Sequence, residues 1–318
     1  MVKIAIAGGS GNVGQEIIDA LVARKMHEII LLSRKNAPSE YAVPGVTWAT
    51  TNYKNAEQLA KILEGVDTVL SFISVATDPG NMTQRNLIEA AVSAGVRRFA
   101  PSEWAGSDSK EGMPWNDGKL EIRKHLQALN QHGKVLEYCL FQPGMFVNYL
   151  TYPYQSARHI QMMQTPIDYD NCRALMVEGS DDARVSLNTA QDVANLVARA
   201  VEYEGEWPTV GGIRGSELTL GQVVELGERV RGRPFTVERP KADDLRAGVV
   251  RSSWLPKPTH PSLTPEQVET QAGAMTAGIL LGLAAGALQV SDEWNKLLPD
   301  VEFAKAEDFL AEAWRGKP

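Results

Sequence analysis

Four glycines near the start of the chain have the spacing of a phosphate-binding loop, in the segment Gly8-Gly9-Ser10-Gly11-Asn12-Val13-Gly14. Two registers fit, Gly8-xx-Gly11-xx-Gly14 and Gly9-x-Gly11-xx-Gly14. In either one, glycines let the backbone turn tightly and approach a pyrophosphate, whose charge is met by the amides of a helix start. The segment follows the apolar run 3–7 and opens a stretch with helical spacing, so it predicts a dinucleotide-binding loop.

The end of the second apolar run, residues 29–32, indicates which dinucleotide would bind. An NAD site places Asp or Glu at this point to accept both ribose hydroxyls. This chain instead has Ser33-Arg34-Lys35, two cations and a hydroxyl with no acid beside them. Such a group suits a 2′-phosphate, so Ser33, Arg34 and Lys35 are expected to bind the adenosine end of NADP(H).

The elements that would position these residues alternate between strand and helix as far as residue 145. Apolar runs predict strands at 3–7, 29–32, 46–49, 67–73, 98–101 and 135–141. Helical spacing predicts helices at 13–22, 55–63, 82–94 and 117–131. Because parallel strands need crossover helices, this order predicts an α/β fold with a doubly wound parallel Rossmann sheet.

The alternation stops after Pro143, and this change predicts a second domain. We expect residues 1–150 to form the dinucleotide-binding domain and residues 151–318 a smaller, partly interleaved α+β substrate domain. A helix near 190–203 is expected to pack back on the first domain. The uncharged segment 272–288 has the length of a buried helix or of a helix that lines an apolar pocket, and falls short of a membrane span.

Several familiar catalytic patterns are absent from the sequence. None of the eight tyrosines is followed by a lysine four residues later, so the Tyr-xxx-Lys pair of short-chain dehydrogenases is missing. There is no Gly-x-Ser-x-Gly, and the five histidines lack the spacing of metal ligands. We therefore expect no metal, and the chemistry must depend on another residue.

The sequence resembles the NmrA-like and isoflavone reductase-like branch of atypical short-chain dehydrogenases, in particular its fungal members. The resemblance extends over essentially the whole chain. It rests on the glycine loop, Ser33-Arg34, and the segments 63–69 (LEGVDTV), 97–104 (RRFAPSEW), 142–148 (QPGMFVN) and 294–299 (WNKLLP).

This resemblance implies that Lys119 is the catalytic residue, since the plant reductases have a catalytic lysine shortly after Pro-Ser-Glu. Lys124 is the alternative if the alignment contains a gap. Two features depart from the plant pattern. Trp104 replaces the usual Phe after Ser-Glu, and the second lysine expected past the arginine is missing, with Lys35 as its substitute.

Further residues are expected around the nicotinamide. Phe72 and Ser74 follow the fourth strand and should border the nicotinamide ribose, because ligands bind at the carboxyl ends of parallel strands. By resemblance, Pro143 and Phe146 flank the nicotinamide. The substrate is expected to contact Trp104, Met145, Tyr149 and His159, in a segment whose aromatic and Met side chains suit a flat apolar molecule.

Composition limits the classes of partner. A net charge of −7 argues against a nucleic-acid-binding surface, and only two cysteines indicate a reducing, cytoplasmic environment. We expect no membrane association, and a monomer or homodimer. The leading hypothesis is an NADPH-dependent reductase of a small apolar metabolite, aromatic or enone-bearing. The alternatives are an NADP(H)-sensing regulator without turnover, and an enzyme that catalyses isomerisation or cyclisation.

Overall fold

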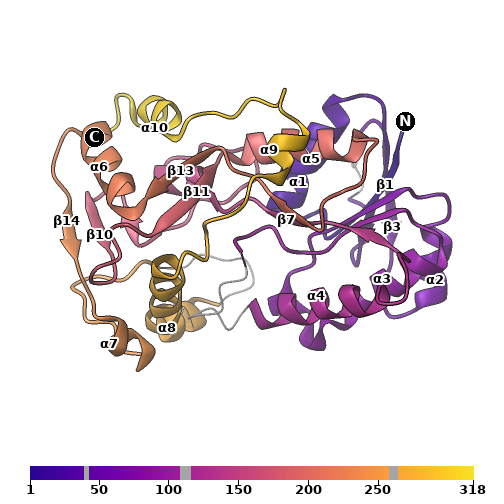
Figure 1. The fold of residues 1–318 in the computed structure, drawn as a ribbon, viewed down its shortest axis with the longest axis horizontal. Helices are drawn as coiled ribbons and strands as arrows, with labels where there is room; N and C mark the ends of the chain where they lie inside the picture. Colours follow the sequence, from indigo (N-terminus) through magenta and orange to yellow (C-terminus); the bar gives the residue numbers. More distant parts are fainter. Residues whose placement is uncertain (39–42, 108–115, 258–263) are drawn as a thin grey trace.

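The computed structural model describes residues 1–38, 43–107, 116–257 and 264–318, and the first half of the chain forms a parallel six-stranded sheet at one end of the molecule (Figure 1). The strands lie in the order β3-β2-β1-β4-β5-β6, which is the Rossmann order. Their bounds are β1 (Lys3–Ala7), β2 (Glu28–Ser33), β3 (Val46–Thr50), β4 (Thr68–Ser71), β5 (Arg98–Ala100) and β6 (Glu137–Tyr138). The predicted doubly wound parallel sheet is confirmed.

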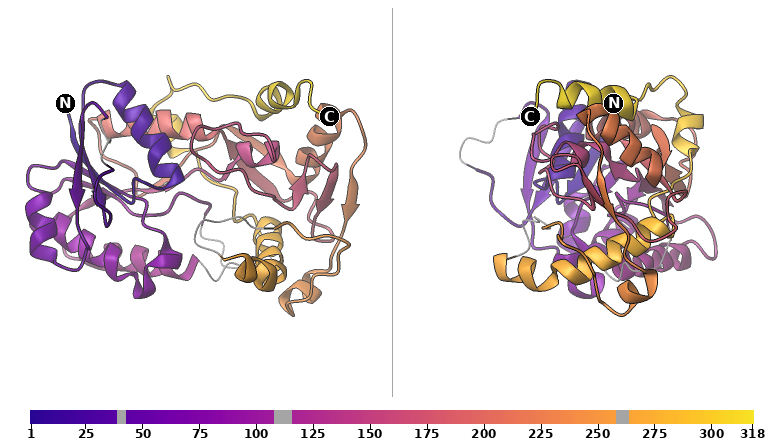
Figure 2. Two further views of the ribbon diagram at one scale, coloured as in Figure 1. Left: turned by 180° about the vertical axis from the view of Figure 1, so that it is seen from behind. Right: turned by 90° about the vertical axis from the view of Figure 1, so that its left-hand side faces the viewer.

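Helices cover both faces of this sheet, as parallel strands buried on both sides require (Figures 1 and 2). One face carries α1 (Asn12–Ala23) and α5 (Ala190–Glu202). The other carries α2 (Ala56–Ile62), α3 (Met82–Ser93) and α4 (Asp117–Leu129). The residues of β1 alternate between the two cores, with Ile4 and Ile6 on the α1 side and Ala5 and Ala7 on the other.

Helix α5 comes from the second half of the chain but packs on α1 of the first half. Its buried Val193 and Val197 share one apolar cluster with Ile17 and Leu21 of α1. The Thr189 side chain caps the start of α5 by accepting a hydrogen bond from the backbone amide of Asp192 at 2.9 Å. The sheet is therefore closed on one face by a helix that is remote in sequence.

The strand expected at 135–141 begins later and is divided. Strand β6 is followed by β7 (Leu140–Gln142), which pairs in parallel with β12 (Val210–Gly212). The amides of Val135 and Leu136 are bound by the side-chain oxygen of Asn130, at 2.9 and 3.1 Å, and so do not join the sheet.

The second half of the chain contains small sheets and helices around their own apolar clusters. Its strands are β8 (Met145–Phe146), β9 (Ile167–Asp168), β10 (Arg173–Leu175), β11 (Arg184–Asn188), β13 (Ser216–Thr219) and β14 (Thr236–Glu238). Its helices are η4 (Val147–Thr151), α6 (Leu220–Arg231), α7 (Ala242–Arg246), α8 (Pro265–Ala284), α9 (Glu293–Leu297) and α10 (Ala306–Trp314).

The apolar segment expected as a helix at 272–288 forms the second part of α8. Leu280, Leu281 and Leu283 are buried, and Gly286, with a φ of +74°, follows the helix end. Among the described residues, no helix has the length and apolar character needed to cross a membrane.

Candidate functional site

The glycine loop connects β1 to α1, and close contacts explain its glycines. Gly8 has a φ of +72°, and a Cβ there would lie 2.8 Å from the carbonyl carbon of Phe72. A Cβ on Gly9 would lie 2.8 Å from the Ile6 side chain, and one on Gly14 would lie 2.8 Å from the Cα of Gly9. The loop is closed by the Gly11 amide, which donates to the Gly8 carbonyl at 3.0 Å.

The start of α1 has no side-chain cap. Gly11 is the N-cap residue, and its position lets Asn12 and Val13 begin the helix directly behind the loop. Ser10 is exposed, and its carbonyl accepts a hydrogen bond from the Gln15 side chain at 2.7 Å. Because the first amides of a helix have no partners within the helix, this end is suited to an anion.

The end of β2 exposes two cations next to this loop. Arg34 and Lys35 are exposed, and neither forms an ion pair with any acid in the described part of the chain. Ser33 is buried, and its hydroxyl accepts a hydrogen bond from the Lys35 amide at 3.1 Å. Ser33 therefore shapes the turn, while Arg34 and Lys35 supply its charge.

Lys119 lies in the first turn of α4, under the loop that follows β5. Its ammonium donates to the backbone carbonyl of Glu103 at 2.6 Å. Burial lowers the pKa of Lys119, and the negative charge of Glu103 acts in the opposite direction. The alternative residue, Lys124, is exposed.

A buried ion pair holds the same loop against α4. The Glu103 carboxylate is 2% exposed and accepts two hydrogen bonds from Arg123, at 2.8 and 2.7 Å. Arg123 lies one turn after Lys119, so these two cations of α4 both reach Glu103, Arg123 at its side chain and Lys119 at its carbonyl. A bidentate pair of this kind fixes the orientation of the loop.

A second contact positions the start of α4. A Cβ on Gly118 would lie 2.4 Å from the side chain of Val75, and the side-chain amide of Asn81 donates to the Gly118 carbonyl at 3.0 Å. Val75 belongs to η1 (Val75–Thr77) and Asn81 to η2 (Pro79–Asn81), in the connection after β4. Ser74 precedes η1, and its carbonyl accepts a hydrogen bond from the Thr77 amide at 3.0 Å.

Phe72 and Trp104 connect the glycine loop with Lys119. Their rings stack with centroids 4.5 Å apart, and the Trp104 indole donates to the Ser71 carbonyl at 2.7 Å. Because Phe72 also contacts Gly8, a continuous series of contacts runs from the glycine loop through Phe72 and Trp104 to Glu103 and Lys119. Trp104 is partly buried within this series.

The segment after β7 lies against the same loop. Gly144, with a φ of +68°, donates its amide to the Ala105 carbonyl at 3.1 Å, and the Pro143 carbonyl accepts from Asn188 at 2.6 Å. Met145 is partly buried and next in sequence, so the structure places Pro143 and Met145 near the Trp104 loop.

Phe146 and Tyr149 form an edge-to-face pair with ring centroids 5.9 Å apart. Phe146 is buried, whereas Tyr149 is partly buried. Burial raises the pKa of the Tyr149 phenol to about 12, so the phenol stays neutral at physiological pH.

The contacts of His159 are with α1. Its imidazole lies 2.8 Å from the Asp19 carboxylate, and its amide donates to Glu16 at 2.6 Å. Among the described residues, these polar contacts are with Glu16 and Asp19 rather than with the loops around Lys119. The hydrogen bonds of His159 therefore hold it against α1 and do not connect it with Trp104, Met145 or Tyr149.

Tyr53 is a residue of the loop region that sequence reasoning missed. It is 4% exposed, and its hydroxyl donates to the Leu32 carbonyl at 2.9 Å, two residues before Arg34. Its partners are backbone groups, so no motif or spacing in the sequence could have indicated this contact.

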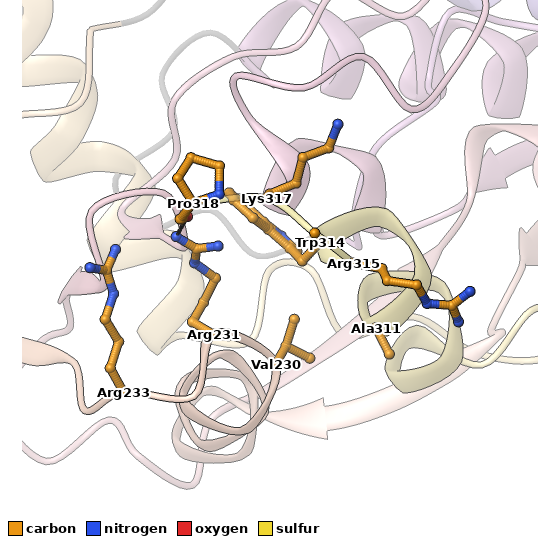
Figure 3. Close-up of a pocket in the computed structure, with 9 residues that line it drawn as sticks. Val230, Arg231, Arg233, Ala311, Trp314, Arg315, Lys317 and Pro318 are labelled. Atoms are coloured by element: carbon orange, nitrogen blue, oxygen red, sulfur yellow. Dashed lines mark hydrogen bonds between the residues drawn. The ribbon is translucent and has the colours of Figure 1, made fainter.

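Metal-ligand clusters and cavities are the other features that could bind a ligand. Within the described residues, no group of three His, Cys, Asp or Glu side chains could hold a metal ion. A cavity of about 340 Å3 lies between α6, α10 and residues 315–318, at the end of the molecule away from the glycine loop (Figures 1 and 3).

The basic residues of this cavity are bound by groups of the chain itself. The Arg231 guanidinium lies 4.2 Å from the Trp314 ring centre and donates to the Pro318 carbonyl (Figure 3). Arg233 donates to the sulfur of Cys172 at 2.8 Å. The Arg231 contacts fasten Trp314 and Pro318 to α6, so this cavity is part of the packing of the chain and the glycine-loop region remains the candidate site.

Comparisons with known proteins agree with this geometry. The chain is 26% identical to the oxidoreductase BOA1 of Botryotinia fuckeliana (strain B05.10), over 97% of this chain and all of that protein. Its fold is similar to the NADPH complex of the quinone oxidoreductase QOR2 of Escherichia coli, with a TM-score of 0.69, 20% identity and coverage of 97% and 99% of the two chains.

A second solved structure, AtPrR2 with NADP+ and (+)pinoresinol, has a TM-score of 0.68 at 18% identity and covers 98% of both chains. At these identities the two structures establish the fold alone. The model of the NmrA-like family matches residues 2–275, which confirms the predicted resemblance. With its glycine loop, Rossmann strand order and this match across most of its length, the chain belongs to the NmrA-like family.

Proposed function

We propose that this protein is an NADP(H)-dependent oxidoreductase that reduces a small, largely apolar metabolite with an aromatic or enone group. The observation that carries the proposal is the placement of the Lys119 ammonium. It is bound to the Glu103 carbonyl and joined by the Phe72–Trp104 stack to the glycine loop. The Lys119 ammonium and the dinucleotide-binding loop thus lie at the same carboxyl ends of the parallel strands.

The residues present fit NADP(H). A side chain at Gly8, Gly9 or Gly14 would collide with its surroundings, so the backbone there is left bare for a pyrophosphate. The uncapped start of α1 supplies amides, and Arg34 and Lys35 supply charge for a 2′-phosphate. Related proteins named as oxidoreductases, and similar folds solved with NADPH or NADP+, support the same cofactor.

NADPH, when bound, supplies the hydride. Reduction of a carbonyl group or enone would place negative charge on the substrate oxygen and would require a proton. The Lys119 ammonium would stabilise the developing charge or transfer the proton itself. Its lowered pKa favours either role, since a poorly solvated ammonium interacts strongly with an anion.

Apolar side chains on the Trp104 loop and on the segment after β7 favour an apolar substrate. Trp104, Met145 and Tyr149 are each partly buried and come from the two segments joined by the Gly144–Ala105 hydrogen bond. Aromatic rings and a methionine bind flat apolar molecules well. Quinone and pinoresinol in the names of similar structures are molecules of this kind.

The test is NADPH consumption with a panel of enones, quinones and phenylpropanoid-like compounds, comparing Lys119→Ala with Lys124→Ala. We expect Lys119→Ala to lower kcat by about 10²–10⁴-fold, the usual range for a lost proton-transfer group. Lys124→Ala is the matched control, because it removes an exposed lysine of the same helix and should leave kcat unchanged.

Other outcomes would redirect the proposal. If no compound oxidises NADPH although the protein binds it in preference to NADH, the protein is a sensor and the reductase proposal fails. Product formed without net loss of NADPH would indicate isomerisation or cyclisation. A Lys119→Ala variant that keeps wild-type kcat would remove Lys119 from the mechanism.

A further inference from the structure

Tyr53 connects the two parts of the proposed cofactor site. The last paired residues of β1 and β2 are Ala7 and Leu32. Beyond this pair the two strands separate: β1 leads into the glycine loop, and β2 leads into Ser33-Arg34-Lys35. The phenol of Tyr53 lies between them, where its hydroxyl donates to the Leu32 carbonyl at 2.9 Å.

The same oxygen also interacts with the glycine loop and with Arg34. Burial raises the pKa of the Tyr53 phenol, whereas a hydrogen bond from the Gly8 amide and the charge of Arg34 lower it. With burial as the larger effect, the hydroxyl keeps its proton and can serve as donor and acceptor at once. It thereby satisfies buried backbone groups at the point where the strands part.

Hydrogen bonds with neighbouring side chains also hold the backbone of Tyr53. Its φ of +59° lies in the left-handed region, which is uncommon for a bulky residue. The Thr51 hydroxyl accepts from its amide at 3.2 Å, and the Asn86 side chain of α3 donates to its carbonyl at 2.8 Å. Two side chains thus maintain a costly conformation that brings the phenol between the loops.

We infer that Tyr53 is a positioning residue for the 2′-phosphate: its hydroxyl fixes the spacing between the glycine loop and Arg34, and so sets the preference for NADPH over NADH. This inference rests on the proposed cofactor. NADH needs the glycine loop for its pyrophosphate but makes no use of Arg34 for a 2′-phosphate. A change in the spacing should therefore weaken NADPH binding more than NADH binding.

The test measures Kd for NADPH and for NADH by fluorescence titration of the full chain. Tyr53→Phe removes only the hydroxyl and should weaken NADPH binding about tenfold, the equivalent of one hydrogen bond, with a smaller effect on NADH. Arg34→Ala should reduce the NADPH preference in the same direction, because it removes the charge itself.

Tyr169→Phe is the matched control. Tyr169 is 1% exposed and its hydroxyl donates to the Val223 carbonyl at 2.6 Å, in the second half of the chain. This variant loses the same type of buried hydrogen bond, so it should lose comparable stability while its ratio of NADPH to NADH affinity stays at the wild-type value.

Hydrogen exchange without nucleotide supplies a second measurement. Tyr53→Phe should speed exchange in the segment 7–14, and Tyr169→Phe should not. An unchanged NADPH preference in Tyr53→Phe, or a wild-type protein with no such preference, would overturn the inference. A wild-type protein that prefers NADPH but reduces no compound would end the reductase proposal alone and would leave the role of Tyr53 supported by the same titration.

Discussion

At the scale of single residues, the proposed reduction depends on the charge of Lys119. Burial lowers the pKa of this ammonium, and the Glu103 carboxylate resists that effect. Arg123 holds the carboxylate in a bidentate pair. The poorly solvated Lys119 ammonium thus lies near a Glu103 carboxylate that is already paired with Arg123. We therefore expect this ammonium to be available for interaction with a substrate.

The first prediction is a loss of reductase activity as the pH rises. A lysine is charged below its pKa, so a lowered pKa means that charge is lost at a lower pH than for a free lysine, whose pKa is about 10.4. We expect kcat at saturating NADPH to be high on the acid side of this transition and to fall on the alkaline side, with a midpoint below the free-lysine value.

Glu103→Gln should move this midpoint further down, because it removes the negative charge that raises the pKa of Lys119. Lys124→Ala should leave it in place. A midpoint that stays fixed or moves up in Glu103→Gln would contradict the assignment of the transition to Lys119.

Residue roles were predictable from sequence only where a motif marked them. The glycine loop has such a motif, whereas the role proposed for Lys119 rests on a resemblance to known reductases and stays a prediction. The Tyr53 hydroxyl interacts with the Leu32 carbonyl and the Gly8 amide. Because every residue has such backbone groups, the sequence does not indicate these contacts. The pairing of His159 with Asp19 joins positions 140 residues apart, so a local pattern of Tyr and Met near His159 was a poor guide to its surroundings.

At the scale of elements, the loop after β5 packs very closely against the segment that follows α8. A Cβ on Gly106 would lie 1.8 Å from the carbonyl oxygen of Ala287, and the Ser107 amide donates to the same oxygen at 2.8 Å. This contact holds the Glu103–Ser107 loop against the segment that follows α8. The position of α8 therefore bears directly on the shape of the candidate site.

Gly106→Ala should be destabilising, because the added methyl group would overlap the Ala287 backbone. We expect a loss of about 1–3 kcal/mol in the free energy of unfolding, as for other overpacked sites. Gly273→Ala, in α8, should instead add about 0.5–1 kcal/mol, since its Cβ would meet nothing within 4 Å and alanine favours a helix.

Urea unfolding of both glycine variants checks this pair of opposite effects. If Gly106→Ala unfolded at the wild-type urea concentration, the backbone of residue 106 could not lie against Ala287 in solution.

Elements were predictable where their signals are local. The first three strands and the helices α1 and α2 follow apolar runs and stop residues. The sixth strand starts late because Asn130 binds the amides of Val135 and Leu136, a side-chain contact that propensity does not report. Helix α8 ends at Ala284 rather than 288, before Gly286 with its positive φ.

At the scale of the whole molecule, one apolar cluster joins the two halves of the chain. It contains Ile4 of β1 and Ile17 of α1 together with Val197 of α5 and Trp294 of α9. Its centre is Phe141, whose ring stacks on Trp294 with centroids 5.4 Å apart and planes within 3°. The sheet and the later segments α5 and α9 consequently share this cluster, in addition to the clusters that each half of the chain forms by itself.

Trp294→Ala should therefore destabilise the entire molecule by about 3–5 kcal/mol, the usual cost of removing a buried large aromatic side chain. Thermal unfolding followed by far-ultraviolet circular dichroism should show one transition at a lower Tm. Trp254→Ala, which removes a partly buried tryptophan, should have a smaller effect. Two separate transitions in Trp294→Ala would show that the halves unfold independently.

The stacked rings Phe72, Trp104, Phe141 and Trp294 also give the molecule an optical property. Adjacent centroids in this series lie 4.5, 5.3 and 5.4 Å apart, with planes within 19° of one another. Aromatic rings held in one fixed, chiral arrangement produce near-ultraviolet circular dichroism, a signal that is lost when side-chain packing loosens. The stack is thus an internal, label-free reporter that runs from the loop beside Gly8 to the core around α9.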